Sequence, residues 1–196
     1  APVSVRGGQT GIQVDNKGTG LTRIIAAGHV EGADGDGVRG ANGSTATDLS
    51  IATASVTGRR TGVSAVNDGT GFTGITRRGD VAALSEAGIF AFNGPAATGL
   101  SIDAEGAQGA IYGVRALNYG VGDTSITTNG LVEGAVAISA QTAGQAIFIE
   151  TNGLVRAASR RSADLAVEGG GGPVVFTNNG GLLGTGQFGA GADEMT

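Results

Sequence analysis

The strongest constraint on this chain is a 15-residue segment that occurs three times at a spacing of 51 residues. The copies read TGIQVDNKGTGLTRI at 10–24, TGVSAVNDGTGFTGI at 61–75 and YGVRALNYGVGDTSI at 112–126. They align without a gap and share glycine, asparagine, threonine and isoleucine at matching positions. Periods of about 20 to 50 residues are typical of solenoids, propellers and other arrays, so the repeat limits the possible folds before any single motif is considered.

The long repeat contains a shorter one of about 25 residues, marked by one asparagine that returns at spacings of 26, 25, 26 and 25. Its members are Asn16, Asn42, Asn67, Asn93 and Asn118. We expect one such asparagine per coil. Their side chains would either stack as a hydrogen-bonded ladder along the coil axis or mark a repeated left-handed turn. A ligand-binding role for these asparagines is the alternative.

Apolar residues at fixed places in each coil predict three short strands, because alternation with period two is the strand signature. The first strand centres on Ile12, Val38, Val63, Ile89, Val114, Val136 and Leu165. The second centres on Ile24, Ile51, Ile75, Ile102, Ile126, Ile149 and Phe176. The third is a Gly-x-Val unit that ends at Val30, Val81, Val132 and Val155. Glycines between the strands would supply the turns.

The sequence therefore predicts an all-β protein, a right-handed parallel β-helix of about seven coils that forms one domain over residues 1–196. The repeat copies lie near 10–60, 61–111, 112–163 and 164–184, and 185–196 is expected to form a frayed tail or a cap. Extra residues around Arg156–Ser162 are expected to form a loop. A helix over Val81–Phe92 is the one alternative element, but the matching stretch 30–41 is rich in glycine, which disfavours helices.

Composition narrows the class further. With 39 glycines, 3 prolines and no three-residue period, the chain is not collagen. The net charge of −5 and the single lysine leave no basic stripe, so we expect no nucleic-acid partner. There is no cysteine and no apolar run long enough for a membrane-spanning helix.

The cadence G-[IV]-x-[AV]-x-N-x-G-x-G-x-[ST]-x-I, followed by TNGLV at 128–132 and 151–155, resembles the passenger region of bacterial autotransporters. More broadly, it is similar to the right-handed parallel β-helices of surface adhesins. The resemblance covers about Gly11 to Leu183. It implies an extracellular or bacterial cell-surface location, with a signal peptide upstream and a membrane barrel downstream in the complete family member.

Two acids are candidate catalytic residues for cleavage of a polysaccharide. The position after each second-strand isoleucine should face outward, and it holds Ala52, Thr76, Asp103, Thr127, Glu150 and Thr177 in successive coils. Asp103 and Glu150 would then lie two coils apart, about 9.6 Å along the axis. Inverting glycosidases separate their carboxyl groups by about 6.5 to 9.5 Å. The alternative is a solvated polar face.

Asp34 and Asp36 are candidate calcium ligands, because acids at i and i+2 on a glycine-rich turn are typical of calcium loops. They match neither the EF-hand loop nor the Gly-Gly-x-Gly-x-Asp repeat, so a plain turn is the alternative and no other cofactor is expected. His29 is the only histidine, and no motif groups it with a serine and an acid.

Two surface features remain. The arginine pairs Arg59-Arg60, Arg77-Arg78 and Arg160-Arg161 are expected at exposed positions, where an anionic glycan or an acidic subunit could meet them. Thr22, Thr73 and Thr124 recur with Ser50 and Ser101 in the coils between them, which would suit an ice-binding face only if they formed a two-wide array.

A structural or adhesive extracellular rod that is surface-exposed or forms filaments explains these patterns best. Its expected partners are other copies bound end to end, or a host or cell-surface glycan or protein. A polysaccharide-active glycoside hydrolase or lyase is the second interpretation, although the sequence leans away from an enzyme. An ion-binding or ice-binding surface is the third.

Overall fold

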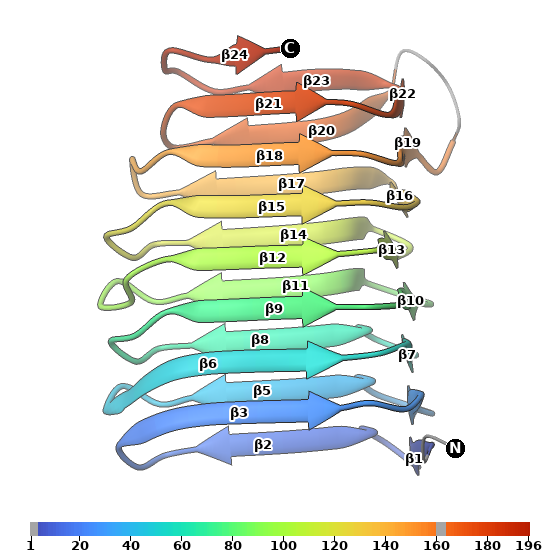
Figure 1. Ribbon diagram of the computed structural model, residues 1–196, viewed down its shortest axis with the longest axis vertical. Coiled ribbons are helices and arrows are strands. Elements are labelled where there is room, and N and C mark those ends of the chain that lie inside the picture. Colours follow the sequence, from blue (N-terminus) through green and yellow to red (C-terminus); the bar gives the residue numbers. More distant parts are fainter. Residues whose placement is uncertain (1–3, 160–163) are drawn as a thin grey trace.

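The computed structural model describes residues 4–159 and 164–196, which form a parallel β-solenoid (Figure 1). The strands on the near side run from left to right as the chain rises from the N-terminus, so the solenoid is right-handed (Figure 1). No helix occurs in these residues. The predicted fold class is confirmed.

Each coil contributes one strand to each of three sheets, which we call A, B and C. Sheet A holds β1 (Val5–Gly7), β4 (Val30–Gly32), β7 (Val56–Gly58), β10 (Asp80–Ala83), β13 (Gly106–Gln108), β16 (Val132–Gly134), β19 (Leu154–Ala157) and β22 (Gly181–Leu183). Sheet B holds β2 (Ile12–Asn16), β5 (Val38–Asn42), β8 (Val63–Asn67), β11 (Ala87–Asn93), β14 (Tyr112–Asn118), β17 (Val136–Thr142), β20 (Leu165–Gly170) and β23 (Thr185–Phe188). Sheet C holds β3 (Gly20–Ala26), β6 (Ala46–Thr53), β9 (Thr73–Arg77), β12 (Leu100–Ala104), β15 (Thr124–Thr128), β18 (Ile147–Thr151), β21 (Val174–Asn178) and β24 (Glu194–Met195).

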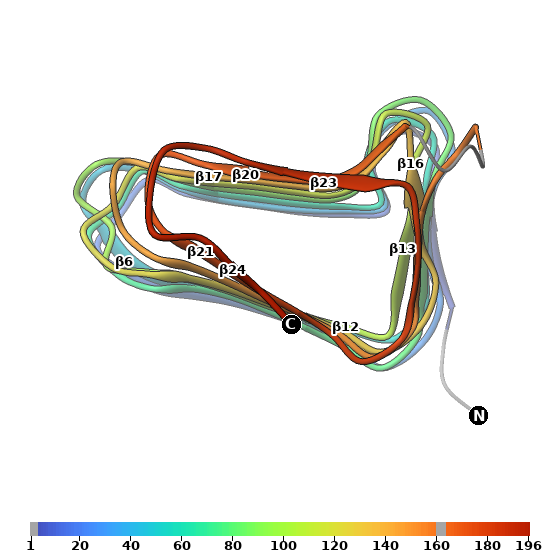
Figure 2. The ribbon, with the colours of Figure 1, turned by 90° about the horizontal axis from the view of Figure 1, so that it is seen from above.

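The eight strands of each sheet follow chain order, so the described chain makes about seven turns between the first and last strand of a sheet. Seen from above, sheets B and C face each other across the interior, and sheet A closes the wide side of the wedge (Figure 2). Every neighbouring pair is parallel. Parallel sheets need their inner faces covered, and here the coils enclose one narrow core.

Stacked isoleucines from sheet C form one wall of that core. The predicted set pairs in register through all seven coils: Ile24, Ile51, Ile75, Ile102, Ile126, Ile149 and Phe176. All of them are buried. Sheet A adds Val30, Val56 and Val81, which are fully buried in successive coils.

The core residues of sheet B follow the prediction through Val114 and then differ. Val114 pairs with Ile138, and Ile138 pairs with Val167, so these two residues continue the wall. The predicted centres Val136 and Leu165 each lie two residues too early. The spacing is 24 residues from Val114 to Ile138 and 29 from Ile138 to Val167, so the regular period is lost there. Alternation with period two makes a shift of two residues invisible to the apolar pattern.

Three further expectations are resolved along the chain. The helix considered for Val81–Phe92 does not form, because its residues belong to β10, a corner and β11. Of the loop expected around Arg156–Ser162, Arg156 and Ala157 belong to β19, and residues 160–163 lie outside the described part. The segment 185–196 is not a frayed tail, because β23 and β24 pair with β20 and β21 and extend two sheets.

The glycine that opens each 51-residue copy is required by close packing between coils. A Cβ atom on Gly62 would lie 2.1 Å from Cγ1 of Val81 and 2.6 Å from the carbonyl oxygen of Gly88, both in the next coil. A Cβ on Gly113 would lie 2.6 Å from Cγ1 of Val132. The repeat therefore keeps glycine where the backbone turns from sheet A into sheet B against a core valine.

The repeated asparagines occupy paired positions on five successive strands of sheet B. Their side chains mainly close the turn that leads into sheet C. Asn67 accepts a hydrogen bond from Gly69 N at 3.0 Å and donates one to Gly71 O at 3.2 Å. Among these five asparagines, only Asn93 and Asn118 are joined by a side-chain hydrogen bond along the axis, at 3.3 Å.

The side-chain amide of the repeated asparagine makes different hydrogen bonds in alternate coils, and this alternation matches the 51-residue period, which spans two coils. Asn16 and Asn118 bind their own turns as Asn67 does. Asn42 and Asn93 instead accept a 2.5 Å hydrogen bond from a threonine of the preceding coil, Thr22 and Thr73 respectively. The structural unit is therefore a pair of coils.

We expect Asn67→Ala to lower the free energy of unfolding by about 1–3 kcal/mol, because the buried N–H of Gly69 and the half-buried carbonyl oxygen of Gly71 lose their side-chain partner. Asn16→Ala is the matched control, since Asn16 makes the same two bonds at the partly exposed end of the solenoid. Its effect should be clearly smaller. Chemical denaturation of both variants measures this, and equal losses would contradict a role that depends on burial.

We expect Gly62→Ala to destabilise the protein by about 1–3 kcal/mol through overpacking against Val81. Gly8→Ala is the control, because a Cβ at Gly8 meets no heavy atom within 4 Å. That substitution should change stability by less than about 0.5 kcal/mol. Thermal melts of the two variants decide the matter, and a tolerated Gly62→Ala would refute the packing explanation.

Candidate functional site

The two acids considered for polysaccharide cleavage lie on one column of sheet C. Asp103 pairs with Thr127, and Thr127 pairs with Glu150, so the carboxylates are two strands apart with a threonine between them. Both acids are exposed. Glu150 accepts a 3.3 Å hydrogen bond from Asn179, and the shallow depression of about 180 Å³ beside it is not lined by Asp103.

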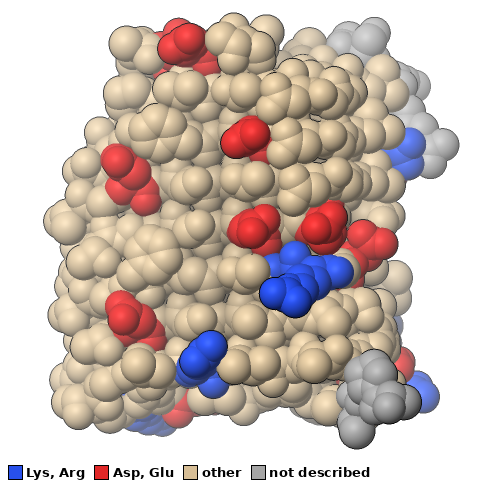
Figure 3. Space-filling view, viewed as in Figure 1, with Lys and Arg blue, Asp and Glu red and all other residues tan. Residues whose placement is uncertain are grey.

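The face of sheet C around these acids is mostly uncharged. Figure 3 shows acidic side chains scattered over it and basic side chains gathered in a few places. The largest depression on this side, about 460 Å³, lies near β3 and β6 and contains Arg23 and Arg78 but no acid. The structure thus places Asp103 and Glu150 as predicted, but no described cavity joins them.

The two acids considered for calcium each meet an arginine of the next coil. Asp34 lies 3.2 Å from Nη1 of Arg59 at an exposed corner. Asp36 is only 1% exposed and accepts a 2.5 Å hydrogen bond from Nη2 of Arg60. The described residues contain no group of three or more metal-ligating side chains. Ion pairs between these two aspartates and the two arginines of the next coil therefore account for the motif.

His29 and the recurring threonines make local contacts. His29 Nδ1 lies 2.9 Å from Ser55 Oγ, and its Nε2 lies 3.3 Å from Thr57 Oγ1, with no carboxylate in either contact. Thr22, Thr73 and Thr124 face the interior and are at most 5% exposed. These three threonines pair in register with leucines and isoleucine, not with Ser50 and Ser101, and so do not form an exposed array.

Arg77 is a buried arginine that the sequence placed on the surface. It is 2% exposed and donates hydrogen bonds to the carbonyl oxygens of Ala54, Gly79 and Asp80 at the corner between sheets C and A. Burial lowers the pKa of its guanidinium to about 10, and the Asp80 carboxylate opposes part of that shift. We assign Arg77 a structural role, because its hydrogen bonds join the backbones of two successive coils.

A second large concavity lies on the outer face of sheet B, and we call it the sheet B groove. Corner loops between sheets A and B stand out beyond the plane of sheet B and overhang its surface (Figure 2). The groove has a volume of about 380 Å³. It is lined by Arg39, Arg60, Thr61, Ser64, Val66, Glu86, Ala87, Phe90, Ile111, Tyr112 and Arg115.

Sheet register explains how these side chains converge. Arg39, Ser64, Phe90 and Arg115 pair in sequence on β5, β8, β11 and β14, so they form one outward column. The corner residues stack in the same way along the wall beside them. The groove therefore combines a basic and aromatic floor with a polar wall.

The three arginines of the groove differ in their partners. Arg60 lies between Asp36 and Glu86, at 2.5 and 3.8 Å. Arg39 lies 3.9 Å from Asp15. Arg115 makes no hydrogen bond or ion pair with the described residues, and its Nε atom is buried; its guanidinium carbon lies 4.8 Å above the ring of Tyr112.

Sequence reasoning missed this groove although a signal was present. The residue after each first-strand apolar position must face outward, and in successive coils it reads Gln13, Arg39, Ser64, Phe90 and Arg115. Only the outward column of the second strand was considered as a site. The overhang of the corner loops is a tertiary feature that no local pattern encodes.

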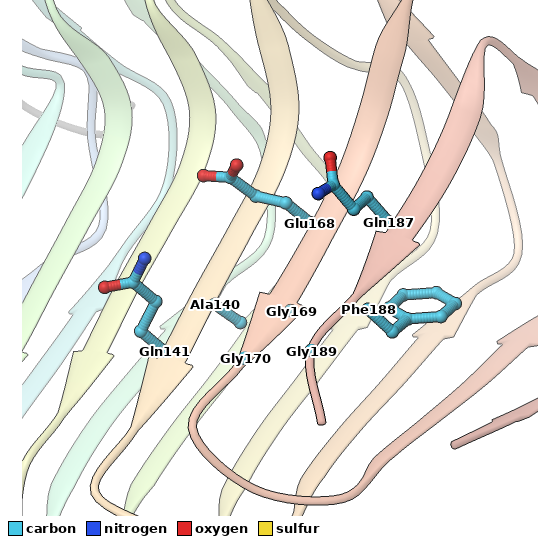
Figure 4. Close-up of a pocket in the computed structure, with 8 residues that line it drawn as sticks. All are labelled: Ala140, Gln141, Glu168, Gly169, Gly170, Gln187, Phe188 and Gly189. Atoms are coloured by element: carbon cyan, nitrogen blue, oxygen red, sulfur yellow. The ribbon is translucent and has the colours of Figure 1, made fainter. Parts of the chain in front are cut away.

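A smaller depression of about 140 Å³ lies on sheet B near the C-terminal end (Figure 4). Gly170, where a Cβ would meet no heavy atom within 4 Å, leaves the space, and Glu168, Gln141 and Gln187 surround it (Figure 4). The Glu168 carboxylate already accepts a hydrogen bond from Ser139. It is the only charged side chain lining the depression, which therefore offers little chemistry.

Comparison with known proteins adds no further identification. No protein-family model matches the chain. Neither curated proteins nor solved structures yield a match. In the part of the chain that the structure describes, no helix has the length and apolar character that crossing a membrane would require.

We expect Arg60→Gln to destabilise the protein by about 2–3 kcal/mol, because it strips a buried carboxylate, Asp36, of its charged partner. Arg59→Gln is the neighbouring control, since the Arg59–Asp34 pair is about two-thirds exposed on both sides. Its loss should cost less than about 1 kcal/mol. Urea denaturation compares the two, and similar small losses would show that Asp36 does not depend on Arg60.

Proposed function

We propose that the protein is a structural and adhesive β-solenoid, a rod that associates end to end and presents its lateral faces to a partner. The observation that carries this proposal is the row of edge strands at both ends of the described solenoid. β1, β2 and β3 lie at one edge of their sheets, and β22, β23 and β24 lie at the other. Such edges offer unpaired backbone groups to any strand of matching register.

The side chains at these ends support the same proposal. Val14 occupies the inward column of sheet B at the first coil and is 36% exposed. At the other end Phe188 packs against the ring of Phe176 at 6.0 Å, and no described segment crosses over the interior (Figure 2). Stacking a second copy on either end would cover apolar core surface as well as backbone groups. A head-to-tail contact of this kind does not close on itself and so leads to filaments.

The proposed setting is extracellular or on a bacterial cell surface, by the resemblance of the repeat cadence to autotransporter passengers and related adhesins. A rod built of short repeated coils suits that setting, because its length and surface change coil by coil without disturbing the core. Enzymatic cleavage of a polysaccharide receives less support, since the candidate carboxylates Asp103 and Glu150 share no cavity.

We expect the wild-type protein to form dimers and longer rods as its concentration rises, and Val14→Lys to remain monomeric. A charge facing inward at an edge strand is an effective block to edge pairing. Gln13→Lys is the matched control, because Gln13 is on the same strand but its exposed side chain faces outward. Sedimentation velocity and electron microscopy provide the measurement.

The expected result is association of the wild type and of Gln13→Lys, and none for Val14→Lys. A wild-type protein that stays monomeric at all concentrations would contradict the end-to-end proposal. Equal association of the two lysine variants would place the contact elsewhere on the rod.

A further inference from the structure

The sheet B groove differs from the rest of the described surface in gathering guanidinium groups and aromatic rings in one concavity. Its floor and wall carry three arginines, one phenylalanine and one tyrosine against a single carboxylate, that of Glu86. The protein as a whole has a net charge of −5. Asp15 pairs with Arg39, and Asp36 and Glu86 pair with Arg60, so Arg115 is the groove arginine without an acidic partner among the described residues.

We propose that this groove binds an acidic polysaccharide and that Arg115 recognises the carboxylate of a uronic acid residue. Arg115 has no carboxylate partner within the described chain, although its Nε is buried. A guanidinium presents a planar fork of N–H donors that matches a carboxylate with two parallel hydrogen bonds. The ring of Tyr112, 4.8 Å from the guanidinium carbon, fixes the plane of that fork.

The other lining groups suit a sugar chain. Phe90 lies beside Arg115 on the floor of the groove, and its half-buried ring offers an apolar surface to the C–H face of a pyranose. Glu86 and Ser64 can exchange hydrogen bonds with sugar hydroxyls. The groove thus joins an apolar surface to several convergent polar groups, a combination that ligand sites use to hold and orient what they bind.

The direction of the groove favours a polymer over a small anion. Arg39 and Arg115 are separated by three strand spacings, about 14 Å along the solenoid axis. A chain that carries a carboxylate on each residue can meet both arginines at once. Nucleic acid is a poorer fit, because polyphosphate binding relies on a dense basic surface and Glu86 and Asp36 offset the charge of Arg60.

This inference rests on the adhesive part of the proposed function, but its test is separate from end-to-end association. Titration calorimetry of the full chain would use a hexasaccharide of galacturonic acid as the probe. A neutral glucose hexasaccharide, a heparin-derived hexasaccharide and a single-stranded RNA serve as comparison ligands. Val14→Lys is titrated in parallel, so that binding by this variant is measured with the proposed end contact blocked.

We expect the galacturonate probe to bind, and Arg115→Gln to weaken that binding by about tenfold or more, because a charge-assisted bidentate pair is lost. Arg115→Lys should recover only part of the affinity, since lysine keeps the charge without the planar fork. Arg78→Gln is the control, because it removes the same charge from an exposed position just beyond β9, on the sheet C side. Arg39→Gln tests the other end of the groove and should weaken binding as well.

The inference is overturned if the wild type does not bind the galacturonate probe, or if Arg115→Gln binds it as the wild type does. Equal binding of the neutral hexasaccharide would leave no role for the carboxylate. Tighter binding of heparin or RNA would assign the groove to a different polyanion. If Arg115→Gln does not fold, as judged by its thermal melt, the Arg39→Gln titration decides the question by the same criterion.

Discussion

Backbone pairing between successive coils is the interaction on which the rest of this structure depends. Each strand lies about 4.8 Å from the equivalent strand of the next coil. A side chain at a given position must therefore pack against the side chains at the equivalent positions of the coils above and below. The column from Ile24 to Ile149 shows the result, with the same β-branched side chain stacked in register. Side-chain packing and turn closure follow from that register, because both require equivalent atoms to meet in adjacent coils.

The same constraint explains which residues the repeat conserves within the chain. Gly62 and Gly113 recur because a Cβ atom would enter the volume of a core valine in the next coil. The asparagines recur because each closes the turn between sheets B and C, and in the inner coils it does so where little water reaches the backbone. Positions that face outward are under no such requirement, and they vary freely from Gln13 to Arg115 along one column.

This division determines how much of the molecule could be predicted. The fold and the sheet C core could be predicted residue by residue, since periodicity reports inward positions directly. Register from β17 onward could not, because successive coils there span 24 and then 29 residues, and period two hides a shift of two residues. Arg77 was placed outside by its charge, whereas the carbonyl oxygens of Ala54, Gly79 and Asp80 make its interior position tenable.

The groove lies where a solenoid of this kind is most able to acquire a site. Its floor is a strand column, which holds side chains at fixed spacing, and its wall is a row of corner loops, which tolerate changes in length and sequence. Arg60 connects the corner wall to the strands, because it pairs with a buried carboxylate of the previous coil and also lines the groove.

Arg115 shows the complementary case. It is fixed by a tyrosine from its own strand and by burial of one nitrogen, yet no acid among the described residues pairs with it. The fold already holds this guanidinium in one orientation, so less conformational entropy is lost when a ligand binds it. Because no acid among the described residues pairs with it, its charge remains available to an external ligand. The rigid register that limits the interior thus also orients the outward groups for recognition.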